Sequence, residues 1–364
     1  MQPTNIFGGG SGTANGYTAH YVAHDGTDTY ANATNSATPC SLATAMGAGG
    51  GAAGDVVFIM DSGTYTRTTA VSLTNNGSTA AYIVVAGIDN QNGANSNGGR
   101  PIIDLQDTGG VNGISVASNN VSWWENLDVR QAGLAGVSIG DRNIAYNIFS
   151  HDNGSDGFDV LGNAVVIFCD SSLNAGNGFF VSSGEIWYCR SFDNSGDGFQ
   201  TNGEAAHHFW CQAFDNTVDG FDCNHHSSNV SFCTADGNGG DGISYTATIK
   251  GGFTFGNILS NNGAYGLNVG TPKLHMTLFN HFHGNTTAAK SGSGYLSADE
   301  TTGDPDFTNA ASDDFSLGAF SNANNLELST TYAGTNPFTD KGTVGTEDAA
   351  GGVKMAGDSG GMVG

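Results

Sequence analysis

A short motif with an acidic residue at a fixed place recurs along the middle of the chain. It reads Asn, two further residues, Asp or Asn, Gly, and an apolar residue. Its acidic position is filled by Asp156, Asn177, Asp197, Asp219 and Asp241. If the repeats stack, these carboxylates repel one another unless they are protonated, splayed apart or bound to a cation. Two roles stay open: corner hydrogen bonds to the backbone, as Asp and Asn often make, or oxygen ligation of Ca²⁺.

Sulfur atoms line up five positions before the Asn of the motif. That column holds Ile148, Cys169, Cys189, Cys211 and Cys233. We expect a structural Cys ladder that packs in the interior, although a disulfide between neighbouring repeats is an alternative. Catalysis by these thiols is disfavoured because buried thiols are inert. Zinc binding is disfavoured too, because the six cysteines of the chain include no Cys-x-x-Cys pair.

Aromatic residues fill the two columns just before the cysteines. The nearer column holds Asn147, Phe168, Tyr188, Trp210 and Phe232, and the next holds Tyr146, Ile167, Trp187, Phe209 and Ser231. Neighbouring strand residues face opposite ways. If the cysteines face inward, so does the Trp187 and Phe209 column, and Phe168, Tyr188, Trp210 and Phe232 form an exposed strip. Such a strip is typical of a glycan or subunit contact. In the alternative, a turn interrupts the alternation and both columns are half-buried.

Other chemistry-bearing residues form weaker patterns. His207 and His208 lie one repeat before His225 and His226 but in different columns, so we expect surface or turn positions. A third histidine pair, His281-Phe282-His283, places two imidazoles on one strand face without an evident third metal ligand. Acidic residues are too numerous to single out a pair of glycosidase carboxylates. The chain has no Gly-x-Ser-x-Gly, P-loop or dinucleotide motif.

The spacing of the motif predicts the elements that position these columns. The glycines of the motif and its weaker copies follow one another at steps of 20 to 24 residues. A period near 22 with short apolar runs and Asn/Gly corners predicts a parallel β-solenoid with three short strands per turn. We expect about ten turns, with the glycine permitting a left-handed corner. The Phe or Ile after it then turns into the core.

Both ends of the chain depart from the repeat. Residues 41–46 read as a short capping helix with Ser41 at its N-cap. Regular coils begin near residue 55 and end near 290. The predicted organisation is an N-terminal arm and cap over 1–54, a β-helix over 55–290, and a Gly/Ser/Asp-rich segment over 291–364. That last segment caps or wraps the final coil, because an open end exposes unpaired strand edges.

The amino-acid composition excludes several classes of binding partner. The chain of 364 residues has 10 Lys and Arg against 34 Asp and Glu, a net charge of −24. This excludes nucleic acid and an anionic membrane surface as partners, because both require clustered cations. A polyanionic substrate is repelled unless divalent cations bridge it. No apolar run approaches the roughly 20 residues that span a bilayer.

Parts of the sequence resemble a known group of proteins. The stretches YVAHDGTD, the Pro39–Ala45 helix and GDVVFIMDSGTY are similar to the start of bacterial and phage right-handed β-helix repeat proteins of the pectate-lyase-like superfamily. The segment GDPDF followed by DFSL is similar to their closing segment. The resemblance covers most of the chain and implies an all-β right-handed parallel β-helix, in phage examples commonly a trimer. It leaves function open, because this fold hosts lyases, hydrolases, epimerases, tailspikes and adhesins.

A narrower resemblance concerns Asp197-Gly-Phe and Asn216-Thr-Val-Asp-Gly-Phe-Asp222, which resemble the core motif of family-nine pectate lyases. It implies that Asp197, Asp219 and Asp222 bind Ca²⁺, although Val218 replaces a further ligand. The catalytic lysine of that family aligns near Ser244, and a serine cannot remove a sugar C5 proton as a lysine can. Lys250 is close but in another register. The sequence therefore offers no residue for the catalytic base that a lyase requires.

Two functions follow as hypotheses. The first is a non-enzymatic structural or binding β-helix, such as a virion decoration, a tailspike-like protein or a surface adhesin, with other surface proteins, a homotrimer or a polysaccharide as partner. The second is a Ca²⁺-dependent polysaccharide lyase or other glycan-active enzyme. The N-terminus shows no secretory signal, whereas the low Lys and high Asn, Ser, Thr and Gly content is typical of extracellular proteins. We therefore expect a virion, extracellular or cell-surface location.

Overall fold

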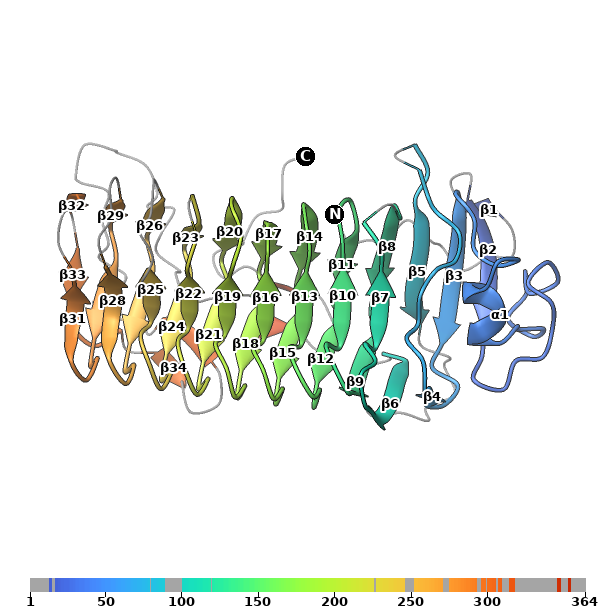
Figure 1. The fold of residues 1–364 in the computed structure, drawn as a ribbon, viewed down its shortest axis with the longest axis horizontal. Helices are drawn as coiled ribbons and strands as arrows, with labels where there is room; N and C mark the ends of the chain where they lie inside the picture. Colours follow the sequence, from blue (N-terminus) through green and yellow to red (C-terminus); the bar gives the residue numbers. More distant parts are fainter. Residues whose placement is uncertain are drawn as a thin grey trace. The chain divides into compact units, whose positions relative to one another are not determined.

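The computed structural model describes residues 13–14, 17–78, 80–88, 100–118, 120–225, 227–245, 252–270, 275–292, 296–298, 300–305, 307–309, 314–317, 346–347 and 353–354. The chain divides into two compact units, Met1–Ala175 and Gly176–Gly364. Each unit is a stretch of parallel β-solenoid, as Figure 1 shows. Among the described residues no helix is long and apolar enough to cross a membrane.

The first unit contains three parallel ladders, called sheets A, B and C. Sheet A holds β2 (Tyr17–Val22), β3 (Asp55–Met60), β5 (Ile83–Ile88), β8 (Ser122–Glu125), β11 (Ile144–Tyr146) and β14 (Ala164–Ile167), with β1 (Thr13–Ala14) antiparallel at its edge. Sheet B holds β4 (Tyr65–Thr66), β6 (Ile102–Thr108), β9 (Asp128–Ala132), β12 (Phe149–His151) and β15 (Asp170–Ser172). Sheet C holds β7 (Ile114–Val116), β10 (Val137–Ile139) and β13 (Phe158–Val160).

The second unit repeats the same three ladders. Sheet A holds β17 (Gly184–Trp187), β20 (Ala206–Phe209), β23 (Asn229–Ser231), β26 (Phe253–Phe255), β29 (Met276–Leu278) and β32 (Leu296–Ala298). Sheet B holds β18 (Arg190–Phe192), β21 (Gln212–Phe214), β24 (Thr234–Asp236), β27 (Ile258–Ser260), β30 (His281–His283) and β33 (Thr301–Thr302). Sheet C holds β16 (Phe179–Val181), β19 (Phe199–Thr201), β22 (Phe221–Cys223), β25 (Ile243–Tyr245), β28 (Tyr265–Val269) and β31 (Ala288–Ser291).

The predicted fold class is confirmed. Among the described residues sheet B holds eleven strands and sheet C nine. Near the N-terminus the repeat is longer than 22 residues. Val84 pairs with Val56, 28 positions earlier, and Trp123 pairs with Val84, 39 positions earlier. Long connections between the early strands therefore use up chain length that a uniform period assigns to extra turns.

The glycine of the motif is required for a different reason from the one expected. Gly198 and Gly220 do not adopt the left-handed backbone conformation. Instead, a Cβ atom on Gly198 would lie 2.6 Å from the carbonyl oxygen of Gly220, and one on Gly220 would lie 2.6 Å from that of Gly242. Glycine is needed because successive corners approach too closely for any side chain. The left-handed positions lie elsewhere, at residues such as Tyr188 and Asp193.

The interior of the second unit is built from stacked like residues, as predicted. The Phe after the motif glycine is buried, and Phe199 stacks between Phe179 and Phe221 with ring centroids 4.7 and 4.8 Å apart. The Asn of the motif forms an asparagine ladder, made of Asn194, Asn216, Asn238, Asn262 and Asn285. Along it, each Oδ1 accepts the backbone N–H and the Nδ2 of the preceding member at 2.9–3.2 Å. The ladder satisfies buried backbone donors that the corners leave unpaired.

The terminal elements agree with the sequence in part. Helix α1 (Leu42–Met46) begins at Ser41, whose side chain accepts the N–H of Thr44, so the predicted N-cap is confirmed. Near the other end, β34 (Phe307–Asn309) and β35 (Asp314–Leu317) form a hairpin. Phe315 of this hairpin lies 4.9 Å from Phe214 of β21, so it packs against the flank of sheet B in the second unit. The strands β36 (Thr346–Glu347) and β37 (Val353–Lys354) pair with each other, and most of the predicted segment 291–364 lies outside the described residues.

Candidate functional site

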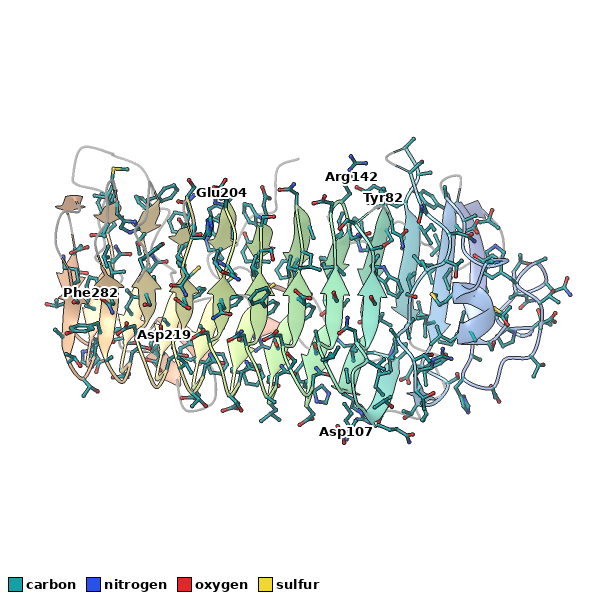
Figure 2. All side chains as sticks on the ribbon, in the orientation of Figure 1. Tyr82, Asp107, Arg142, Glu204, Asp219 and Phe282 are labelled. Carbon is teal, nitrogen blue, oxygen red and sulfur yellow. The ribbon has the colours of Figure 1, made fainter. Side chains whose placement is uncertain are left out.

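The outward positions of sheet C in the second unit carry hydrogen-bonding side chains in register. Gln200 pairs with Asp222, Asp222 with Ser244, and Ser244 with Asn268. Gln200, Asp222 and Ser244 are the second residues of β19, β22 and β25, and Asn268 is the fourth of the five residues of β28; the residues on either side of each are buried. We call these four residues, together with the corner carboxylates Asp197, Asp219 and Asp241, the polar face. Figure 2 shows Asp219 at the corner that leads into β22.

The corner carboxylates use one oxygen on the backbone of the next turn. Asp197 Oδ1 accepts the N–H of Asp219 at 2.9 Å, and Asp219 Oδ1 accepts that of Asp241 at 2.6 Å. Asp241 Oδ1 accepts the N–H of Tyr265 at 2.8 Å. The corner hydrogen bonds that the sequence left open as one role are thus formed. The second oxygens remain available to side chains, as when Asp241 Oδ2 accepts Asn268 Nδ2 at 2.8 Å.

Gln200 joins carboxylates from successive turns. Its Nε2 donates to Asp197 Oδ2 at 3.2 Å and to Asp222 Oδ2 at 3.5 Å. Asn224 also donates to Asp222 Oδ2. Asp197 and Asp222 are only 5% and 8% exposed. The structure therefore joins Asp197 and Asp222 through Gln200, and Asp219 lies close to both.

Burial and mutual repulsion favour the protonated forms of these carboxyls. Burial raises the pKa of Asp222 to about 7, helped by the nearby charges of Asp197 and Asp219. Burial likewise raises the pKa of Asp219 to about 6, with Asp241 and Asp197 contributing. Burial raises the pKa of Asp197 as well, against its hydrogen bonds to Asp219 and Gln200. Near neutral pH the cluster can both accept and donate hydrogen bonds.

As they stand, these side chains do not form a closed calcium ligand set. Among the described residues no group of three or more His, Cys, Asp or Glu side chains is arranged to hold a metal ion. Asp197 and Asp219 each use one carboxylate oxygen to accept a backbone N–H. Val218, at the position where the resemblance places a further ligand, is apolar and 43% exposed. Calcium binding by Asp197, Asp219 and Asp222 stays a prediction.

Ser244 stands where the resemblance places a lysine. It is 1% exposed, and its hydroxyl makes no hydrogen bond of acceptable geometry with the residues that the structure describes, although it lies close enough to lower the pKa of Asp219. A serine hydroxyl beside carboxyls that are partly protonated is a hydrogen-bonding group and no base for proton abstraction from carbon. Lys250 lies outside the described residues.

At the aromatic strip a turn interrupts the strand alternation and both aromatic columns are half-buried, which is the second of the two alternatives given by the sequence. Phe168 in the first unit and Tyr188, Trp210 and Phe232 in the second are half-buried and left-handed, with φ of 54–59°. One left-handed residue between two strands reverses the alternation. Trp187 and Phe209 therefore face outward and are half-buried, and the expectation that they face inward is wrong.

The rings of the strip stack on one another in the second unit. Trp210 lies between Tyr188 and Phe232 with centroids 5.2 Å apart on both sides and interplanar angles of 12° and 15°. Trp187 stacks on Phe209 at 4.5 Å. Because neighbouring rings cover one another's faces, the strip presents ring edges to solvent. A sugar that stacks on an aromatic residue needs an open ring face, so this arrangement suits an apolar contact better than sugar stacking.

The four cysteines of the predicted ladder are buried thiols that form no disulfide among the described residues. In the first unit Cys169 Sγ accepts the N–H of Ile148 at 3.4 Å, and in the second Cys233 Sγ accepts that of Cys211 at 3.3 Å. Cys189 is buried in the same way. Burial raises the pKa of the Cys233 thiol well above its usual range. Asn257 then continues the column by accepting the N–H of Cys233 at 2.8 Å, so the thiols take the place of side-chain acceptors in an interior ladder.

The histidines have mostly internal roles. His208 is fully buried, bonds Thr201 Oγ1 at 3.0 Å, and has its pKa lowered to about 3 by burial, so the expectation of a surface or turn position is wrong for it. It faces inward because His207 takes the outward position of β20. The ring nitrogens of His281 contact Thr301 Oγ1 and the carbonyl oxygen of Gly303, both at 2.8 Å. His226 lies outside the described residues.

Comparison with known proteins places this geometry in a structural group. No protein-family model and no curated protein matches the sequence. Among solved structures, the pectate lyase Pel9A is 18% identical, with 94% of this chain and 93% of that chain covered and a TM-score of 0.56. A rhamnogalacturonan lyase is 19% identical, with 78% and 87% covered and a TM-score of 0.58. The fold is a pectate-lyase-like right-handed parallel β-helix.

Likeness at this level of identity establishes the fold of the β-helix and leaves its chemistry to the side chains. Sequence reasoning identified the carboxylates of the polar face but missed Gln200 and Asn268. The signal for both was present, because each is the outward neighbour of an inward-facing apolar residue in the strand after the motif glycine. Reading that position across the repeats collects Gln200, Asp222, Ser244 and Asn268.

Proposed function

We propose that the protein is a non-enzymatic β-helix that binds a polysaccharide chain along the polar face. The observation that carries the proposal is the register of Gln200, Asp222, Ser244 and Asn268, which repeats a hydrogen-bonding side chain at each of four successive turns. A polysaccharide repeats its hydroxyl groups along an extended chain, and carboxylates, amides and hydroxyls are the groups that recognise them.

Two further facts support a carbohydrate ligand. The similar solved structures are a pectate lyase and a rhamnogalacturonan lyase, both named for carbohydrate substrates. The polar face combines acceptors with carboxyls whose pKa is raised to about 6 for Asp219 and about 7 for Asp222, so it can pair with hydroxyls in either direction. The net charge of −24 favours a neutral glycan, or an acidic one bridged by divalent cations.

Affinity measurements with defined variants test the proposal. Cellohexaose, galactohexaose and hexagalacturonate are titrated into the protein by calorimetry, with and without Ca²⁺. We expect Asp222→Asn and Gln200→Ala to weaken the tightest complex about tenfold each, the effect of losing a hydrogen bond to a charged group. Asp159→Asn is the matched control, because Asp159 is the second residue of β13 in the first unit and also has a pKa raised by burial. Equal affinity of all four proteins contradicts the proposal.

We propose that this binding serves a surface, as in a virion decoration, a tailspike-like protein or an adhesin, with a virion, extracellular or cell-surface location. The ring edges of Tyr188, Trp210 and Phe232 support a contact with another subunit, either a second copy in a homotrimer or another surface protein. Detection of the protein in purified virions or in a surface fraction, by immunoblot, tests the location.

A second candidate is a Ca²⁺-dependent polysaccharide lyase. The gathering of Asp197, Asp219 and Asp222 favours it, because a cation would relieve the repulsion that raises their pKa values. Ser244 in place of a basic residue speaks against it. The test is the appearance of unsaturated product from a panel of uronates, with Ca²⁺ and with chelator. Activity that requires Ca²⁺ and is abolished by Asp219→Ala establishes the enzyme and replaces the binding proposal.

A further inference from the structure

The outer surface of sheet A in the first unit contains two buried polar atoms without partners. Glu125, at the end of β8, is 7% exposed, and its Oε2 has no hydrogen-bond partner among the described residues. Trp123 lies two positions earlier on the same face of the strand, and its Nε1 is also buried without a partner. A buried carboxylate oxygen and a buried indole N–H each carry a considerable desolvation cost when unpaired.

These two atoms are close to each other without being bonded. Burial raises the pKa of Glu125 to about 7, and the indole of Trp123 lowers it from within hydrogen-bonding reach of the carboxylate. No hydrogen bond of acceptable geometry joins them. The arrangement therefore offers one donor and one acceptor side by side, and a group that both accepts and donates can satisfy the two at once.

The same residue pair occurs in a closed form in the second unit. There Trp187 Nε1 donates directly to Glu185 Oε2 at 3.1 Å, again two positions apart on one face of a sheet A strand. Glu185 is exposed, whereas Glu125 is buried. A Trp–Glu pair on this scaffold can thus bond internally, and the pair at Trp123 and Glu125 does not.

The surroundings of the open pair are aromatic and polar. Tyr146 pairs with Glu125 in the next strand, and its ring lies 6.2 Å from that of Trp123 and 5.5 Å edge-on from that of Phe168. Beyond it, Arg100 donates to Asn147 Oδ1. On the other side Ala86 of β5 pairs with Glu125. Half-buried rings around a few polar groups are typical of sites that hold a sugar.

We propose that Trp123 and Glu125 form a second glycan-binding site, which holds a sugar hydroxyl that accepts from Trp123 Nε1 and donates to Glu125 Oε2. An ammonium group cannot accept from the indole, and an anion is repelled by the carboxylate, so a neutral hydroxyl fits both atoms. The proposal shares with the proposed function its class of ligand, a polysaccharide, but uses different residues in the other unit.

Conservative variants test this site. Trp123→Phe removes the donor together with part of the ring system, and Glu125→Gln removes the charge with little change in volume. Trp187→Phe and Glu185→Gln make the same changes in the closed pair and serve as matched controls. Each protein is titrated with cellohexaose, galactohexaose and hexagalacturonate, and quenching of tryptophan fluorescence is recorded. We expect Trp123→Phe and Glu125→Gln to weaken binding about tenfold and both controls to retain the wild-type affinity.

The outcomes separate this proposal from the function of the polar face. Loss of affinity in Asp222→Asn with none in Trp123→Phe or Glu125→Gln overturns the second site alone, and the reverse pattern overturns the polar face alone. Binding of none of the three oligosaccharides to the wild type overturns both. A crystal structure at high galactose concentration adds a direct view: a sugar hydroxyl between the two atoms supports the site, and a lone water molecule there overturns it.

Discussion

Removal of one rung of the asparagine ladder has a calculable effect on stability. Asn216 is 1% exposed, and its Oδ1 accepts the backbone N–H of Asn194 at 3.2 Å and Nδ2 of Asn194 at 3.0 Å. Its own Nδ2 donates to the carbonyl oxygen of Ser191 at 3.0 Å and to Asn238 Oδ1 at 3.0 Å. Asn194 Nδ2 keeps a second acceptor in Ser191 Oγ, so the groups that lose most in Asn216→Ala are one backbone N–H and one backbone carbonyl.

Each buried group deprived of its partner costs about 1–3 kcal/mol, so we expect Asn216→Ala to lower the free energy of unfolding by roughly 2–6 kcal/mol. Urea denaturation followed by circular dichroism measures this change. The control is Asn202→Ala, because Asn202 is exposed, and a change within about 0.5 kcal/mol is expected there. If Asn216→Ala is as stable as the control, the side chain does not bridge successive turns and the reasoning is refuted.

Further predictions concern the strip, the carboxyl cluster and the thiols. Trp210→Ala removes a ring that stacks on Trp187, Tyr188 and Phe232 and should shift the sedimentation coefficient towards the monomer; an unchanged coefficient removes the strip as a subunit contact. Because burial raises the folded-state pKa of Asp219 to about 6 and of Asp222 to about 7, their contribution to stability is complete below about pH 4 and is lost as the pH rises through these values. In chelator, the unfolding free energy of the wild type should therefore fall more between pH 4 and 8 than that of Asp222→Asn, and added Ca²⁺ should reverse the fall if the cluster binds it; parallel pH profiles would contradict the assigned burial. Cys211 and the other cysteines should react with a thiol reagent only at the rate of unfolding, and rapid labelling of the native protein would show that the ladder is accessible.

The fold was predictable because its corners have a local cause. The motif glycine is compulsory wherever turns stack closely, and Gly198 and Gly220 therefore recur at the solenoid period. The orientation of the aromatic columns was less predictable, because it depends on one left-handed residue. A bulky residue such as Trp210 is rare in that conformation. Its residue type therefore does not predict the reversal of the strand alternation that turns Phe209 outward.

The candidate site, like the fold, was predictable from the sequence only in part. Asp219 and Asp222 belong to the motif and were identified from it, whereas Gln200 acts through a contact with carboxylates of two turns that depends on side-chain direction. The pair of Trp123 and Glu125 was missed altogether. It lies in the part of the chain where the repeat is longest, and its distinguishing property is a missing hydrogen bond, which only coordinates reveal.

Hydrogen–deuterium exchange with and without the tightest-binding oligosaccharide tests most directly whether the polar face is where the glycan binds. We predict slower exchange, on addition of the ligand, in peptides that cover β19, β22, β25 and β28, and a loss of that protection in Asp222→Asn. Unchanged exchange in these four strands at saturating ligand would contradict the account.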